Sequence, residues 1–537
     1  MKLKKKDVAK LFAVAAAIGA GAAATAVAVN RRNKRKAAEE LKRLPKGRNI
    51  YFLGNSLSAL FGAAYLIKDF GFRGDSIHIY GKYAVDGCGS DESGFVCTDM
   101  AFIASENSQC LFDVLKDVPS HELEDISVKT EIENYNNAYP LSSAGRLFGI
   151  EGGDVSRNDK KQLAQLLRTL PDPSVTLGDI FGADFFDSDF YAMWQSLFLL
   201  ERDSSAAEFA KQLGEMLFAA DNVETCEGVY DTSFNRYECI YLPLYEYLKG
   251  CGVEFCEDIE VTDIDFDEEN ENVTSFHIVD RETRKTFFLN GGDMCIMTPC
   301  TVYEAMTEGS FDAPAPAYGG ERFPLWRKLY EKRGGIGRPD ELSEEPVILF
   351  TATFKNDLLT SRLFDVTMNS PGTLLTLTDS KWRMSVSVPM DKYFSAQKDG
   401  TYILTGRILN CGTEGSCVKK AAMHASGAEV LYELVCLLGL EDEWDEIREG
   451  VVNVIPVLLP YGGAAVSAGN QKALSPMHAA GNLACIGEFA QCGKAKGDME
   501  YYAASAKEAV YGMFGKTADR GKQKKPVFAG FRIGKRV

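Results

Sequence analysis

The sequence is poor in the residues that build metal sites. Its fourteen cysteines include no C-x-x-C pair, and its five histidines lie far apart, at His78, His121, His277, His424 and His478. Zinc sites usually need paired thiolates or imidazoles at short, fixed spacing, so we expect no metal ion. The single, scattered cysteines also argue against a disulfide framework. We expect buried, reduced thiols in a body that faces the cytosol.

Long hydrophobic runs are also scarce, which excludes a polytopic membrane protein. The composition, 45% hydrophobic and 25% charged residues, excludes a disordered or collagen-like chain. A length of 537 residues suits three to four domains.

The one long apolar run, residues 11–29, is uncharged and long enough to cross a membrane as a helix. Basic clusters flank it at 4–6 and 31–36, and the second cluster opposes translocation of the chain that follows. We therefore expect a membrane anchor with a cytoplasmic body. A cleaved signal peptide is the alternative, because Ala-x-Ala triplets occur near the end of the run.

Positive charge gathers at both ends of an acidic chain. Residues 1–47 carry 13 basic and 3 acidic side chains, residues 516–537 carry 8 and 1, and the whole chain has a net charge of −17. The acidic body makes nucleic acid an unsuitable partner. We expect the basic termini to contact anionic membrane lipids, although residues 516–537 would equally suit a disordered, solubilising tail.

The pattern after residue 48 predicts a βαβ unit. Residues 49–53 are typical of a short buried strand, residues 54–59 of a loop of small side chains, and residues 60–70 of a helix; residues 76–80 form a second strand. In this arrangement the loop amides and the helix N-terminus can bind a pyrophosphate.

The glycine fingerprint of such a unit is incomplete. It reads Gly54-x-Ser56-x-x-Ala59, so serine replaces the second glycine. Gly81 and Lys82 stand where an acid normally binds the ribose hydroxyls. A Rossmann-like unit that binds no nucleotide is therefore an open alternative.

A series of collinear motifs then resembles the oleate hydratase family, formerly called myosin-cross-reactive antigens. The motifs run from residue 48 to residue 515 and include 84–96, 110–113, 185–194, 234–243, 379–382, 404–407, 455–461 and 486–489. The resemblance implies an α/β fold, in which a Rossmann-like FAD-binding core carries an inserted substrate domain and a helical C-terminal region. It also implies addition of water across a cis double bond of a long-chain unsaturated fatty acid, without net redox change at the flavin.

The resemblance divides the chain as follows. A basic N-terminal segment (1–47) precedes an FAD-binding domain in three pieces (48–130, 225–310 and 481–515), a substrate domain in two pieces (131–224 and 311–480), and a basic tail (516–537). A homodimer is possible in such a protein. The cofactor-binding residues that it implies are Gly54, Asn55, Ser56, Ser58, Asp86, Gly87 and Gly487.

The acid and base that alkene hydration requires do not carry over. The family's R-G-G-R-E stretch falls within 97–109, where Asp99 and Glu106 are the nearby carboxylates, and Gln212 stands at the family's tyrosine position. Glutamine can orient water but cannot transfer a proton usefully. Three hypotheses follow: a hydratase, a flavin-dependent double-bond isomerase, or a non-catalytic flavin- or lipid-binding relative.

Three further features have ordinary structural explanations. Cys110 lies among apolar neighbours and is expected to be a buried structural thiol rather than a nucleophile. The acidic stretch 263–271 fits a strand running into a solvated hairpin better than a calcium loop. Residues 501–513 predict a final amphipathic helix packed on the core.

Overall fold

The computed structural model describes residues 47–81, 89–91, 94–98, 103–104, 108–123, 125–139, 145–219, 229–269, 271–342, 345–462, 475–497 and 499–518. The proposed anchor at 11–29 therefore lies outside the described residues, as does most of the basic tail. Within these ranges, no helix is both long and apolar enough to cross a bilayer.

The first sheet has six strands in the order β19-β20-β12-β1-β2-β8, and all neighbours are parallel except β19 and β20. It confirms the predicted α/β class. Its strands come from three distant parts of the chain: β1 (Ile50–Leu53) and β2 (Ile77–Gly81), then β8 (Glu254–Glu257) and β12 (Met294–Met297), then β19 (His478–Ala480) and β20 (Leu483–Cys485).

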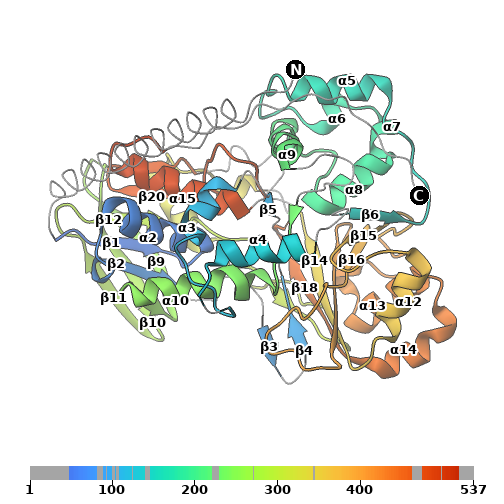
Figure 1. The fold of residues 1–537 in the computed structure, drawn as a ribbon. Helices are drawn as coiled ribbons and strands as arrows, with labels where there is room; N and C mark the ends of the chain where they lie inside the picture. Colours follow the sequence, from blue (N-terminus) through green and yellow to red (C-terminus); the bar gives the residue numbers. More distant parts are fainter. Residues whose placement is uncertain are drawn as a thin grey trace, which may run out of the picture.

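The predicted strand, loop, helix and strand are confirmed in this order, but the helix begins at Leu57, three residues earlier than expected, so the loop is shorter. Helix α2 (Leu57–Phe70) connects β1 to β2 and is capped at its C-terminal end by Gly71, which has a left-handed φ of 66°. A side chain at Gly62 would meet the Phe52 ring at 2.7 Å, so glycine allows α2 to lie close on β1. The predicted final helix, α15 (Met499–Met513), packs beside α2 and α3 (Gln109–Leu115) (Figure 1).

A three-stranded antiparallel sheet covers the opposite face of the first sheet. It has the order β11-β10-β9, with β9 (Ile259–Phe266), β10 (Val273–Asp280) and β11 (Thr283–Phe288). Phe276 of β10 packs against the rings of Tyr51 and Tyr80, 5.3 Å from each. The acidic stretch lies at the end of β9 and in the following hairpin, as predicted, and Lys332 pairs with Asp263 and Asp265.

The second large sheet has seven strands, in the order β13-β18-β14-β17-β16-β15-β6. Only the β15–β6 pair is parallel. Its strands are β6 (Gly145–Phe148), β13 (Thr307–Glu308), β14 (Val347–Phe354), β15 (Leu374–Leu377), β16 (Met384–Ser387), β17 (Tyr402–Ile408) and β18 (Val451–Leu459); helices α12 (Leu358–Thr367), α13 (Gly427–Leu437) and α14 (Trp444–Gly450) pack beside it.

A helical layer lies above β6 (Figure 1). Its core is aromatic, with Trp194 stacked on Phe190 and packed edge-on against Phe209. The helices are α5 (Arg157–Leu166), α6 (Leu177–Ile180), α7 (Ala183–Phe186), α8 (Asp189–Phe198) and α9 (Ala206–Ala219). Apart from short 3-10 and π-helical turns, the other described elements are β3 (Gly89–Asp91), β4 (Gly94–Val96), β5 (Ile103–Ala104), β7 (Val229–Tyr230), α4 (Val128–Ala138), α10 (Leu242–Gly250) and α11 (Pro324–Arg333).

The expectation that all cysteines are reduced is wrong at one place. Cys417 and Cys436, 19 residues apart, form a disulfide. The loop before α13 folds back onto that helix because the buried Glu433 carboxylate accepts hydrogen bonds from the backbone amides of Cys417 and Val418, at 3.0 and 2.7 Å. Ten further described cysteines are free, and burial raises the pKa of the Cys110 thiol, which suits the predicted structural role.

Candidate functional site

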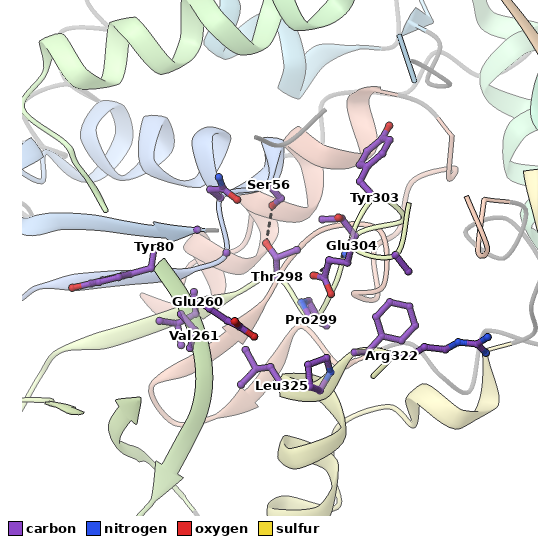
Figure 2. A pocket seen from close by; sticks show the side chains of 18 of the residues that line it. Ser56, Tyr80, Glu260, Val261, Thr298, Pro299, Tyr303, Glu304, Arg322 and Leu325 are labelled. Atoms are coloured by element: carbon purple, nitrogen blue, oxygen red, sulfur yellow. Dashed lines mark hydrogen bonds between the residues drawn. The ribbon is translucent and has the colours of Figure 1, made fainter. Parts of the chain in front are cut away.

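A cavity of about 330 Å³ opens at the carboxyl ends of β1, β2 and β12. Ligands of open α/β sheets bind at this edge, and the volume lies within the range of small-molecule sites. The walls come from five segments of the chain: the loop 53–56, the end of β2, the start of β9, and the segments 298–306 and 318–325 (Figure 2).

The bend after β1 forms one wall of the cavity. The Gly54 amide donates a hydrogen bond to the Tyr80 carbonyl at 2.9 Å, and its φ of 120° is one that other residues rarely adopt. A side chain at Gly54 would also lie 3.1 Å from the Thr298 Cβ. Glycine is therefore required here both by conformation and by the close approach of the segment after β12.

Ser56, which replaces the second glycine of the fingerprint, has two partners. Its hydroxyl caps α2 by accepting a hydrogen bond from the Ala59 amide at 3.3 Å. It also lies 2.7 Å from the Thr298 hydroxyl, so the two side chains connect the first loop to the segment after β12 (Figure 2). The serine therefore ties two walls of the cavity together.

The other cofactor-binding residues from the sequence fall into three groups. Asn55 lines the cavity. Ser58 and Gly487 instead meet at Ser505 of α15, whose hydroxyl lies 3.4 Å from the Ser58 hydroxyl and 3.3 Å from the Gly487 amide. Asp86 and Gly87 lie outside the described residues.

Two carboxyl groups that sequence reasoning missed point into the cavity. Glu260 extends from β9 and Glu304 from the segment after β12, and both reach the space beside Thr298 and Pro299 (Figure 2). Burial, together with Glu488 and Glu260 nearby, raises the pKa of Glu304 to about 8. Neither residue lies in one of the family-like motifs, so no signal in the sequence pointed to them.

Gln212 occupies a second, separate region. It is fully buried on α9, and its amide nitrogen donates a hydrogen bond to the Lys496 carbonyl at 3.1 Å. Its buried amide oxygen accepts no hydrogen bond from the described residues. Asp99 and Glu106 lie outside the described residues, but β5, which stands between them in the sequence, packs against α9.

The groups around Gln212 form a buried polar seam between α9 and residues 494–496. Glu208 accepts a hydrogen bond from the Lys496 amide and pairs with Lys211 at 3.1 Å. Burial lowers the pKa of Lys496 to about 8 and raises the pKa of Glu215 to about 7. The seam therefore holds two groups that change charge near neutral pH, and neither of them lines the cavity.

No metal centre accompanies these two regions. Within the described ranges, no three His, Cys, Asp or Glu side chains are grouped so that they could hold a metal ion.

The fold and cavity define a mixed α/β protein with a dinucleotide-type βαβ unit at the edge of its parallel sheet. The profile of the MCRA family matches residues 47–511. The chain therefore belongs to the MCRA family, which confirms its resemblance to the oleate hydratases.

Two relatives are similar over most of their length. An oleate hydratase of Streptococcus pyogenes serotype M49 (strain NZ131) is 27% identical over 511 residues, covering 87% of this chain and 86% of that protein. A linoleate hydratase of Lactiplantibacillus plantarum is 26% identical over 508 residues, covering 82% of this chain and 88% of that protein. Among solved structures, an oxidoreductase from Methanosarcina mazei matches with a TM-score of 0.46 and 11% identity, covering 85% of this chain and 98% of that one.

Proposed function

We propose that this protein is a hydro-lyase that adds water across a cis double bond of a long-chain unsaturated fatty acid and binds FAD without net redox change. The observation that carries the proposal is the family match over residues 47–511, together with two hydratases that align over more than four fifths of their length. The proposed substrate class, unsaturated fatty acids, is taken from the names of those two relatives, an oleate hydratase and a linoleate hydratase.

The cavity at the Gly54 bend is the proposed FAD site. Gly54, Asn55 and Ser56 would hold the diphosphate side, because the bend offers backbone amides beside the N-terminus of α2. The residues fit such a group: the Ser56 hydroxyl is already bonded to Thr298, and Gly54 keeps side-chain atoms out of the approach. FAD would supply shape and charge to the site.

One observation favours a second candidate, a binding protein without catalysis. Gln212 stands where the family places a tyrosine hydroxyl, and an amide is no acid or base.

For the hydratase, Asp99 and Glu106 are the proposed substitute acids, since β5 lies between them in the sequence and packs against α9, which carries Gln212.

A single product analysis separates these functions. The purified protein is incubated with FAD and either oleate or linoleate, and the products are analysed by mass and absorbance. A gain of one water supports hydration, unchanged mass with a conjugated-diene absorbance means isomerisation, and no product favours the binding protein. Where hydration occurs, unaltered turnover in both Asp99→Asn and Glu106→Gln would dismiss the substitute acids. If the protein shows no flavin absorbance and FAD does not shift its melting temperature, the proposal that it binds FAD is refuted.

We also propose that the basic ends hold the protein at the cytoplasmic face of a membrane. Their charge, opposite to that of the body, supports this location. Cell fractionation tests it: the full chain should sediment with membranes, and recovery of the body from the extracytoplasmic fluid would contradict it.

A further inference from the structure

The end of β2 has no room for the acid that dinucleotide-binding folds place there. Gly81 ends β2, and the Asn55 side chain occupies the space that a Cβ at position 81 would need. In other folds of this type, an acid at this end binds the ribose hydroxyls of the adenosine half. Here the carboxylate must come from elsewhere, if the same ligand is bound.

Glu260 brings a carboxylate into the same cavity from the neighbouring sheet. It belongs to β9, which packs beside β2, and it lines the cavity together with Asn55 and Gly81. Its side chain extends between Val261 and Leu325 toward the interior of the cavity (Figure 2).

The order of the strands distinguishes Glu260 from Glu304 in the cavity. β1 lies between β2 and β12 in the sheet. Glu304 follows β12 and so approaches from the far side of β1, whereas Glu260 approaches from the β2 side. The ribose acid of a dinucleotide fold belongs to the β2 side.

We propose that Glu260 binds the ribose hydroxyls of an adenine nucleotide in this cavity and so replaces the missing acid of β2; this rests on the proposed FAD site. A carboxylate can accept hydrogen bonds from both hydroxyls of a ribose, and such charge-assisted bonds are among the stronger ones. The same carboxylate repels a 2′-phosphate. The site is therefore selective for a nucleotide with a free 2′-hydroxyl.

Calorimetric titration of the full chain tests the assignment with four ligands: FAD, ADP, 2′-deoxy-ADP and 2′-phospho-ADP. The wild type should bind ADP roughly tenfold more tightly than 2′-deoxy-ADP, as expected for loss of a charge-assisted hydrogen bond. Glu260→Gln and Glu260→Ala should weaken ADP roughly tenfold more than they weaken 2′-deoxy-ADP, so that the variants bind both ligands about equally, and they should reduce the discrimination against 2′-phospho-ADP.

Glu331→Gln is the matched control, since Glu331 is exposed on α11, which packs beside β9, does not line the cavity and loses the same charge. It should leave all four affinities within about threefold of the wild type. If both Glu260 variants weaken ADP and 2′-deoxy-ADP equally, or neither ligand at all, the ribose assignment is overturned while the cofactor site stands. If the wild type binds neither FAD nor ADP, the proposed FAD site fails as well.

Discussion

The pKa of Glu304 predicts how FAD affinity depends on pH. Burial and the nearby Glu488 and Glu260 carboxylates raise it to about 8, so the carboxyl is roughly nine-tenths protonated at pH 7 and roughly nine-tenths ionised at pH 9. A protonated carboxyl can donate a hydrogen bond to a phosphate oxygen, whereas a carboxylate repels it. If the diphosphate binds only the protonated form, the dissociation constant rises about tenfold between pH 7 and pH 9.

Titration calorimetry with FAD at pH 7, 8 and 9 measures this slope. Glu304→Gln is neutral throughout and should keep its affinity within about threefold across the range, whereas Glu331→Gln, outside the cavity, should retain the wild-type slope. Lys496 also has a pKa of about 8 but does not line the cavity. The reasoning is refuted if wild-type affinity is flat with pH, or if Glu304→Gln keeps the tenfold loss.

Three further predictions concern stability and the bend. Gly54→Ala should cost about 1–3 kcal/mol in the free energy of unfolding and weaken FAD binding, because of its φ of 120° and the 3.1 Å approach of Thr298; an unchanged melting temperature would contradict this. Cys417→Ser should lose about 3 kcal/mol for the 19-residue loop closed by Cys436, measured by urea denaturation, and a reductant should then have no further effect. Trp326→Ala should cost about 3–5 kcal/mol in the same assay, because the side chain is fully buried and its indole bonds the backbone at 2.7 Å; a loss below 1 kcal/mol would count against it.

The local elements of the first βαβ unit were predictable from sequence. The short apolar run in residues 49–53, helical spacing in 60–70 and the glycine at 54 each reflect backbone geometry over a few residues. The final helix was predictable for the same reason, and its bounds, Met499–Met513, differ by only two residues at one end. Family membership was visible because collinear motifs survive at low identity.

The contents of the site were decided by tertiary structure. Glu260 and Glu304 reach the Gly54 bend only because β9 packs beside β2 and because β12 pairs with β1 in parallel, about 240 residues along the chain. Likewise, the disulfide of Cys417 depends on a loop folding back onto α13. The periodicity of apolar residues indicates the secondary structure of a single segment. Strand order and packing instead depend on contacts between segments that are far apart in the sequence.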